Sequence, residues 1–320
     1  MRILVTGSYG LVGMALASAC QLRGWDIVPF DLVRPDAIAV EDICDIDLLR
    51  AAAADCDGVV HLAAISRVAW GESRPDLCHT INVGGTAAVT ETVLSAARQP
   101  WLIFASSREV YGEPPHMMIS EDDPIAPLNH YGRSKAAGEA LIAEARASGA
   151  RTAIARLSNV YGGRRDHPDR AVPALVSRAL RGADLEITGS GNYFDFVHVR
   201  DTVDGLIALI ERLVSGQADL PPIQFATGIA TSLGALARLA VQLTDSTSRV
   251  LEQPARAFDV SGFCGTPLRA DQMLGWSPRI TLEQGIADLA ADLRDNGPME
   301  AIGIPDPEAL RAVHGGTLGR

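Results

Sequence analysis

The 320-residue chain lacks the sequence features of membrane proteins and of general nucleic-acid binders. It contains no run of about 18 uncharged apolar residues, so no membrane span is expected. With 28 basic against 39 acidic residues, its net charge of −11 argues against a sequence-independent grip on nucleic acid or on an anionic membrane. The N-terminus also lacks the apolar stretch and cleavage site of a signal peptide. A hydrophobic content of 47% instead predicts a globular protein of one large or two modest domains.

Cysteine is scarce, and its pattern suggests neither disulfides nor a metal site. The five cysteines are odd in number and form no CxxC motif. No cluster of His, Cys and carboxylate residues has the spacing of metal ligands. We therefore expect reduced, buried thiols, no metal, and a cytoplasmic location.

Lysine is almost absent, since Lys135 is the one lysine among the 28 basic residues. Tyr131 precedes it by four positions, so both lie on one face of a helix predicted over 129–148. With five tyrosines in 320 positions, a lone lysine has a chance of roughly 1.6% of this spacing. An ammonium beside a phenol favours the phenolate, which makes Tyr131 a candidate base. Ser107, just after a strand predicted at 101–105, could bind the same substrate oxygen.

Short apolar strands alternate with helical segments through the first half of the chain. Strands are predicted at 2–6, 26–30, 58–62, 101–105, 151–157 and 195–199, and helices up to about residue 23 and at 47–54, 76–98, 129–148, 171–182 and 201–214. This alternation predicts an α/β fold with a doubly wound parallel sheet covered on both faces.

The pattern loosens beyond about residue 160, which suggests a second, smaller domain. We expect a dinucleotide-binding domain over 1–160 plus about 195–228. The substrate-binding domain would take about 161–194 plus 229–296, interleaved with the end of the first. The tail from 297 to 320 is rich in Gly and Pro and is expected to be partly disordered.

Gly7, Gly10 and Gly13 lie between the first predicted strand and the helix that follows it. Glycine there permits a tight turn and a close approach of the backbone to a pyrophosphate at the helix N-terminus. Asp31, at the end of the second strand, could accept hydrogen bonds from an adenosine ribose, or could simply cap a turn. A carboxylate there repels a 2′-phosphate, which favours NAD, while Arg34 keeps NADP open.

Several segments, taken in order, resemble the extended short-chain dehydrogenase/reductase superfamily. They are most similar to its NAD-dependent sugar epimerase/dehydratase group, which includes UDP-glucose 4-epimerase-like proteins. The matching segments are TGSYGLVG at 6–13, Asp45-Ile46, HLAA at 61–64, INVGGT at 81–86, SSREVYG at 106–112, YGRSK at 131–135, RLSNVYG at 156–162, FDFVHVRD at 194–201 and LGW at 274–276.

The resemblance implies a Rossmann-type fold and an NAD-dependent epimerase that acts on a nucleotide-activated sugar through a transient ketone. Tyr131 would be the base, Lys135 would bind the nicotinamide ribose and tune Tyr131, and Ser107 would orient the substrate. A homodimer would form through helices 76–98 and 129–148. The implied cofactor contacts are Gly7, Tyr9, Gly10, Leu11, Val12, Gly13, Asp31, Asp45, Ile46, Leu62, Ala63, Ala64, Asn82, Tyr131, Lys135 and Leu157.

Phe194 departs from the family pattern, because many nucleotide-sugar members carry an arginine at this position. Arginine suits a diphosphate, since its fork pairs with two oxygens. Arg164 and Arg165 are further candidates for an anion contact. The expected substrate contacts are Arg67, Ser107, Arg108, Asn159, Phe194 and Arg256.

A second departure is the pair Arg108-Glu109, which stands where family 4,6-dehydratases have Asp-Glu and uronic-acid decarboxylases often have Ser-Glu. Glu109 matches the residue that abstracts a ring proton in the dehydratases, so it is a further catalytic candidate. It could instead orient a hydroxyl or form a salt bridge. Arg108 cannot donate the proton that a leaving hydroxyl needs.

Three alternatives to the epimerase therefore stay open. The first is an NAD(P)-dependent dehydrogenase or reductase of a free sugar or sugar acid, which Phe194 favours. The second is a nucleotide-sugar decarboxylase or dehydratase that uses Glu109. The third is a non-catalytic dinucleotide-binding scaffold or redox sensor, which would have no need of Ser107, Tyr131 and Lys135.

Overall fold

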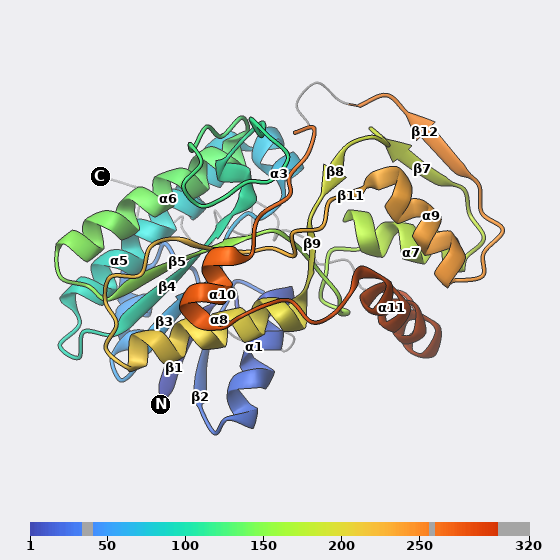
Figure 1. The fold of residues 1–320 in the computed structure, drawn as a ribbon. Helices are drawn as coiled ribbons and strands as arrows, with labels where there is room; N and C mark the ends of the chain where they lie inside the picture. The colour runs from blue at the N-terminus through green and yellow to red at the C-terminus, as the bar shows by residue number, and fades with distance from the viewer. Residues whose placement is uncertain (34–40, 256–259, 300–320) are drawn as a thin grey trace.

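The computed structural model describes residues 1–33, 41–255 and 260–299. Two predicted residues, Arg34 and Arg256, lie outside these ranges, as does most of the predicted tail, 300–320. The described chain forms a central sheet with helices on both faces, and a smaller group of helices and strands stands beside it (Figure 1).

The central sheet has six parallel strands in the order β10-β5-β4-β3-β1-β2. Its strands are β1 (Arg2–Thr6), β2 (Asp26–Phe30), β3 (Gly58–His61), β4 (Trp101–Ser107), β5 (Thr152–Leu157) and β10 (Ile223–Phe225). From β1 the chain adds β2 on one side and β3 on the other, so the strand order reverses there. Ligands of such sheets bind in the crevice at the carboxyl ends of the strands beside this reversal. The predicted doubly wound parallel sheet is thus confirmed.

Helices cover both faces of this sheet. One face carries α1 (Leu11–Leu22), α8 (Val199–Val214) and the short α10 (Leu268–Leu274). The other carries α2 (Ile46–Ala53), α3 (Val68–Ser73), α4 (Pro75–His79), η1 (Thr80–Gly84), α5 (Gly85–Ser95) and α6 (His130–Ala147). A short 3₁₀ turn, η2 (Arg108–Val110), follows β4.

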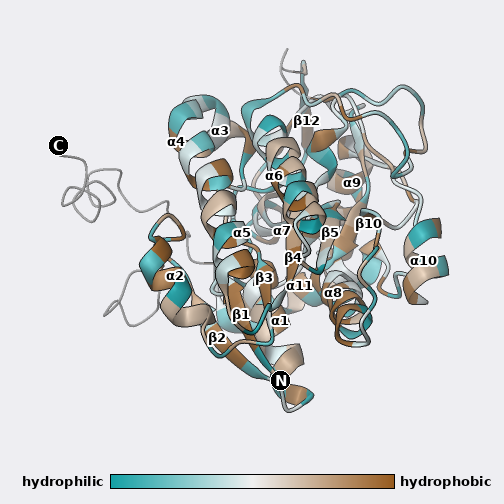
Figure 2. Ribbon diagram, turned by 90° about the vertical axis from the view of Figure 1, so that its left-hand side faces the viewer, coloured by the Kyte–Doolittle hydropathy of each residue, from teal (hydrophilic) through white to brown (hydrophobic). Residues whose placement is uncertain are grey.

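Alternate residues of the central strands pack into two separate hydrophobic cores, one on each face of the sheet. Ile3 and Val5 of β1 pack with α1 and α8, whereas Leu4 between them packs with α2 and α5 on the opposite face. This follows from the two-residue period of a strand, and it explains why these strands are apolar on both faces. Figure 2 shows the hydrophobic residues gathered along the sheet and on the helix faces that cover it.

The helix predicted over 76–98 consists of three consecutive segments, α4, η1 and α5, and ends at Ser95. The middle segment, η1, is a π-helical turn that contains Asn82. Such a turn accommodates an extra residue and is frequent at functional sites. The local sequence has no proline or other signal that predicts it.

The smaller part of the molecule has its own hydrophobic core. It contains β6 (Asn159–Tyr161), α7 (Ala171–Leu180), β7 (Leu185–Thr188), β8 (Tyr193–Phe194), β9 (Phe196–His198), β11 (Thr231–Ser232), α9 (Leu233–Leu243), β12 (Val250–Gln253) and α11 (Leu282–Asn296). Helices α7, α9 and α11 pack around Leu236, Ile286 and Val176. The segment with α10 and Trp276, which the predicted boundaries place in this part, packs on α8 and β10 of the first core.

Glu139 of α6 and Arg156 of β5 form a buried ion pair between that helix and the sheet. Arg156 Nη2 donates to Glu139 Oε2 at 2.8 Å, and Nε donates to Oε1 at 2.9 Å. Ser106 Oγ of β4 also donates to Glu139 Oε1 at 2.5 Å, and Arg156 Nη1 donates to the Tyr111 hydroxyl at 3.0 Å. The pair therefore ties α6 to two strands.

Replacing Glu139 with Gln should lower the free energy of unfolding by about 3–5 kcal/mol, because Arg156 would keep its charge in a buried place without a carboxylate. The matched control is Glu91→Gln, which breaks the surface pair with Arg50 and should cost no more than about 1 kcal/mol. Urea unfolding of both variants measures the difference. Equal effects would show that the buried pair does not tie the helix to the sheet.

Candidate active site

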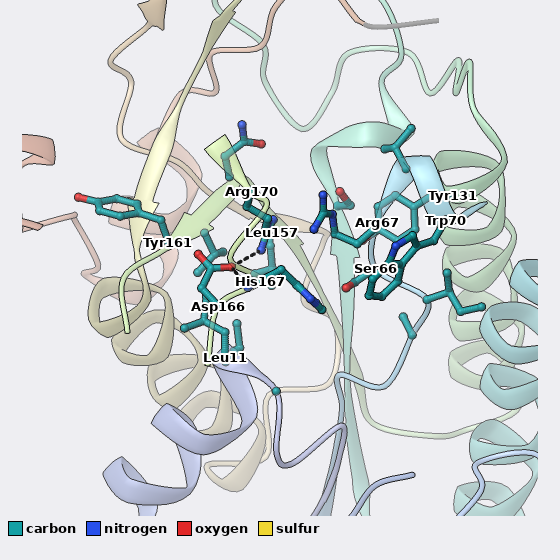
Figure 3. Close-up of a pocket in the computed structure, with 18 of the residues that line it drawn as sticks. Leu11, Ser66, Arg67, Trp70, Tyr131, Leu157, Tyr161, Asp166, His167 and Arg170 are labelled. Carbon is teal, nitrogen blue, oxygen red and sulfur yellow. Dashed lines mark hydrogen bonds and ion pairs between the residues drawn. The ribbon is translucent and has the colours of Figure 1, made fainter. Parts of the chain in front are cut away.

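A cavity of about 1070 Å³ runs along the carboxyl ends of the central strands and reaches the smaller part of the molecule. The glycine loop and the end of β2 line one end, and α7, β7 and Phe194 line the other. Sites for one drug-sized ligand usually measure about 300–1,000 Å³, so this cavity lies at the upper end of that range. Figure 3 shows Asp166, His167 and Arg170 facing Arg67, Trp70 and Tyr131 across it.

The glycine loop is packed so tightly that two of its glycines have no room for a side chain. Gly7 has φ +69°, and a Cβ there would lie 2.7 Å from the Ala63 nitrogen. A Cβ on Gly13 would lie 2.2 Å from the carbonyl oxygen of Gly7. Gly10 differs, because it has φ −74° and its Cβ would lie 3.4 Å from that same oxygen. Gly10 is therefore not required by packing within the loop.

The N-terminus of α1 lines the cavity and is suited to an anion. Its N-cap, Gly10, offers no side chain to the N–H groups of the first turn, and no acidic residue stands there. The first-turn N–H groups of a helix have no intrahelical acceptor, and the helix dipole makes this end positive. The loop thus fits the pyrophosphate of a dinucleotide. Of the other predicted cofactor contacts, Tyr9, Leu11, Val12, Leu62, Ala63, Ala64 and Leu157 line the same cavity.

Asp31 lies where the sequence places it, at the end of β2 and on the cavity wall. Its Oδ2 accepts from the Tyr9 nitrogen at 2.8 Å and its Oδ1 accepts from the Val33 nitrogen at 3.1 Å. Burial raises the pKa of Asp31, although these backbone donors act in the opposite direction. Glu41, which the sequence analysis missed, lines the cavity at the same end. Two carboxyl groups therefore stand at this end of the cavity.

Asp45 and Ile46, predicted to contact the adenine side, do not line the cavity. Asp45 is the N-cap of α2, and its Oδ1 accepts from two N–H groups of the first turn at 3.1 Å. Ile43, three residues earlier, does line the cavity. The dipeptide Asp-Ile occurs twice within this segment, at 42–43 and 45–46, and the sequence pattern did not distinguish the two. In the structure Ile43 faces the cavity and Ile46 does not, while the contact of this segment with the adenine side stays a prediction.

Asn82, another predicted cofactor contact, lies outside the cavity lining and hydrogen-bonds to residues on either side of it, Ile65 and Ser134. Its Oδ1 accepts from the Ile65 nitrogen at 2.7 Å. Its Nδ2 donates to the Ile65 oxygen at 3.1 Å and to Ser134 Oγ of α6 at 2.8 Å. Asn82 is buried and does not itself line the cavity. It holds the segment that follows β3 against α6.

Ser107, Tyr131 and Lys135 converge on one wall of the cavity, and all three are buried. Ser107 ends β4, while Tyr131 and Lys135 lie on one face of α6 near its start. The Tyr131 hydroxyl is hydrogen-bonded with Ser107. Lys135 Nζ donates to the Ala105 carbonyl at 2.8 Å and lies 6.0 Å from the centre of the Tyr131 ring.

Burial controls the charges of this trio. Burial raises the pKa of Tyr131 to about 12, against the opposing hydrogen bond from Ser107, and Glu109 raises it further. Burial lowers the pKa of Lys135 to about 8, so its ammonium is mostly charged at neutral pH. Desolvation of the phenolate outweighs the groups that stabilise it, so Tyr131 in the protein alone is a neutral phenol at neutral pH, and the tuning of Tyr131 by Lys135 stays a prediction.

Arg108 and Glu109 form an ion pair in the cavity wall directly after Ser107. Arg108 Nη2 lies 2.6 Å from Glu109 Oε1, and Asn129 Nδ2 donates to Glu109 Oε2 at 2.7 Å. The salt-bridge alternative that the sequence left open for Glu109 is the one the structure contains. Arg108 Nε donates to Asn159 Oδ1 at 2.7 Å, and its guanidinium lies 4.6 Å above the Phe194 ring.

The remaining arginine candidates differ in their surroundings. Arg67 lines the cavity and pairs with Asp169, which joins the segment before α3 to the loop 162–170. Arg164 does not line the cavity, because it donates to the Asn296, Gly297 and Pro298 carbonyls at the end of α11. Arg165 does line it, and within the described ranges the structure gives it no acceptor.

The loop 162–170 also contributes residues to which the sequence analysis assigned no role. Asp166 is buried in the cavity wall, where its Oδ1 accepts from the His167 nitrogen at 2.8 Å and contacts Arg170 Nη1 at 3.4 Å (Figure 3). The His167 ring packs edge-on against Trp70 at 5.0 Å between centres. The sequence offers one signal for this part of the cavity wall, namely the run of polar residues at 162–170, after the strand predicted at 151–157.

The described ranges contain neither a helix that could cross a membrane nor a group of three or more His, Cys, Asp and Glu residues placed to hold a metal ion.

A glycine loop at the strand reversal and a buried Ser-Tyr-Lys trio beside it define a dinucleotide-binding enzyme of the short-chain dehydrogenase/reductase type. Residues 3–220 match the NAD dependent epimerase/dehydratase family. The chain belongs to this family.

Relatives of several activities share most of their length with the chain. UDP-glucose 4-epimerase of Mycolicibacterium smegmatis is 30% identical, over 90% of this chain and 96% of the relative. dTDP-glucose 4,6-dehydratase of Streptomyces niveus is 28% identical, over 95% of this chain and 98% of the relative. The crystal structure of a Thermotoga maritima UDP-glucose 4-epimerase with UDP-glucose superposes with a TM-score of 0.85 at 25% identity, covering 92% of this chain and 99% of that one.

Other relatives are UDP-glucuronic acid decarboxylases, and other solved structures with this fold are complexes with NAD. The comparisons thus establish the family and not the particular reaction.

Gly13→Ala and Gly10→Ala should separate the folding role of the loop from its binding role. Gly13→Ala should lower the free energy of unfolding by about 1–3 kcal/mol, because its Cβ meets backbone. Gly10→Ala should change it by no more than about 0.5 kcal/mol but weaken NAD binding about tenfold or more, because its Cβ would stand where the pyrophosphate approaches. Urea unfolding and calorimetric titration with NAD measure the two effects, and a stable, NAD-binding Gly13→Ala would contradict the packing argument.

Proposed function

We propose that the chain is an epimerase that inverts one hydroxyl-bearing carbon of a nucleotide-activated sugar through a transient ketone. The observation that supports this most directly is the buried Ser107–Tyr131–Lys135 trio in a cavity that continues to the glycine loop. The same cavity is lined by both the glycine loop and the trio, which supports simultaneous binding of a dinucleotide and a substrate.

In this proposal Tyr131 and Ser107 hold the substrate hydroxyl from two sides. Tyr131 acts as the phenolate: it accepts the hydroxyl proton and becomes a neutral phenol while hydride leaves the same carbon, and Ser107 keeps the oxygen in place. The ammonium of Lys135, mostly charged at neutral pH, stabilises the Tyr131 phenolate before the proton is transferred. NAD, when bound along the glycine loop, supplies the hydride acceptor. Return of the hydride to the opposite face of the ketone inverts the carbon, and Tyr131 gives the proton back.

We also propose that NAD is preferred to NADP. Asp31 and Glu41 both line the end of the cavity where the adenosine ribose would lie. Two carboxylates there would repel a 2′-phosphate, whereas a ribose hydroxyl can donate to them.

Phe194 supports a second candidate, a dehydrogenase of a free sugar or sugar acid. Without an arginine at this position, the diphosphate of a nucleotide sugar loses one bidentate partner. Arg165, the cavity-lining arginine to which the described structure gives no acceptor, can supply a positive charge to such a group instead. We therefore favour the nucleotide sugar.

The test is turnover of a panel of UDP-, dTDP-, GDP- and CDP-sugars, including a uronic acid, followed by mass spectrometry and proton NMR. The proposed function predicts an isomer of unchanged mass and no accumulation of NADH. NADH formed in proportion to an oxidised free sugar or sugar acid would support the second candidate. Loss of water or carbon dioxide would replace both with a dehydratase or decarboxylase.

Replacing Tyr131 with Phe should reduce turnover by about 10²–10⁴-fold, because the acid–base group is lost while the ring remains. Calorimetric titration should show unchanged NAD binding within about twofold, since the glycine loop is untouched. Ser107→Ala should lower turnover less, because Tyr131 remains. Full activity in Tyr131→Phe would exclude Tyr131 as the base and favour a non-catalytic scaffold.

We propose a homodimer through the face formed by α5 and α6, which exposes Leu94, Ala140, Ala143 and Ala147. These small and apolar side chains would let two copies of the helix pair approach closely. Ala140→Glu should convert the dimer to a monomer in light scattering. A wild-type protein that is monomeric at micromolar concentration would refute the proposal.

A further inference from the structure

Arg108 and Glu109 are adjacent, oppositely charged residues that are both removed from solvent. Their side chains are 12% and 7% exposed. They belong to the short turn η2, which starts directly after Ser107, and the Glu109 nitrogen donates to Ser107 Oγ at 3.2 Å. A carboxylate thus stands within one turn of the residue that would orient the substrate.

A carboxylate in this place would ordinarily be a base for the ketone intermediate. Oxidation of a carbinol acidifies the hydrogens on the neighbouring carbons, and a positioned carboxylate can remove them. Removal of such a hydrogen is the first half of water elimination, so it would divert an epimerase toward dehydration. The negative charge of Glu109 acts on Tyr131 in the site, since it contributes to raising the pKa of that tyrosine.

Both carboxylate oxygens of Glu109 are engaged by donors. Oε1 pairs with Arg108 Nη2 at 2.6 Å, and Oε2 accepts from Asn129 Nδ2 at 2.7 Å. Asn129 cannot easily follow a moving carboxylate, because its Oδ1 accepts from the Gly132 nitrogen as the N-cap of α6.

Arg108 is itself held from several sides. Its Nε donates to Asn159 Oδ1 at 2.7 Å, and its guanidinium lies 4.6 Å from the centre of the Phe194 ring and 5.9 Å from that of Phe263. An aromatic face attracts a desolvated guanidinium, whereas an arginine at position 194 would place a second positive charge against it. The two departures from the family pattern, Arg108 and Phe194, are therefore linked, because the Phe194 ring packs directly against the Arg108 guanidinium.

We infer that Arg108 is a positioning residue that determines the outcome of the reaction by withholding Glu109 from proton abstraction. With Glu109 fixed in the ion pair, the ketone keeps its neighbouring hydrogens and can only take back hydride. This inference rests on the proposed function, and it names the feature that excludes elimination of water.

The test follows deuterium in the product when the sugar panel is turned over in D₂O. Wild-type protein should form an isomer without carbon-bound deuterium. Arg108→Gln, which leaves Glu109 without its cation, should raise the deuterium at the carbons beside the inverted centre by about tenfold or more per turnover. The double variant Arg108→Gln/Glu109→Gln should lose this deuterium again, because no carboxylate remains to remove the hydrogen.

Two further variants separate this effect from damage to the fold. Arg108→Lys keeps a cation beside Glu109 and should give deuterium-free product even if it turns over more slowly. Arg165→Gln removes the same charge from the same cavity and should also give deuterium-free product at whatever rate remains. A merely structural role for Arg108 would lower the rate of Arg108→Gln without introducing deuterium.

The outcomes distinguish the two proposals. Wild-type isomer that carries deuterium, or Arg108→Gln isomer that carries none, would overturn the role of Arg108 and leave the epimerase standing. Failure of the wild-type protein to isomerise any nucleotide sugar would overturn the proposed function and this inference with it.

Discussion

The site depends on how α6 packs against β4 and β5, because this packing fixes the helix relative to the carboxyl ends of the strands. Tyr131 and Lys135 belong to the helix, whereas Ser107 belongs to the strand, so a shift of one against the other would separate them. Three contacts prevent the shift. Lys135 donates to the Ala105 carbonyl, Glu139 binds Ser106 and Arg156, and a Cβ on Gly138 would lie 2.5 Å from the Phe104 ring. The buried contacts of α6 with β4 and β5 therefore also fix the positions of Tyr131 and Lys135 relative to Ser107.

The same burial that fixes this geometry decides which charges are available. It raises the pKa of Tyr131 to about 12 and lowers that of Lys135 to about 8, so both uncharged forms are favoured relative to water. At neutral pH the protein alone therefore holds Tyr131 as a neutral phenol and Lys135 mostly as an ammonium. The buried pair of Arg108 and Glu109 follows a different rule, because two opposite charges satisfy each other and both stay fixed.

Most of the cofactor end could be read from local sequence. The glycine spacing, the following helix and the carboxylate at the end of the second strand are close together in the chain, and the structure places Gly7, Gly13 and Asp31 as predicted. The dipeptide Asp-Ile stands at 42–43 as well as at 45–46, and only the tertiary structure shows that Ile43, and not Ile46, faces the cavity. The role of Asn82 depends on a π-helical turn for which the sequence has no local signal.

The sequence by itself determined the fold class, the glycine loop and the Tyr131–Lys135 pair, because each depends on residues within a few turns of one another. Only the tertiary structure shows that Glu109 is held in an ion pair and that Phe194 packs against the Arg108 guanidinium. Glu109 pairs with the adjacent Arg108, but its second contact is with Asn129, and Arg108 in turn contacts Asn159 and Phe194. These last three contacts join segments far apart in the chain, and no spacing rule relates them. Side-chain pairing in the cavity wall is set by how β4, β6, β8 and α6 pack, which is a property of the whole fold.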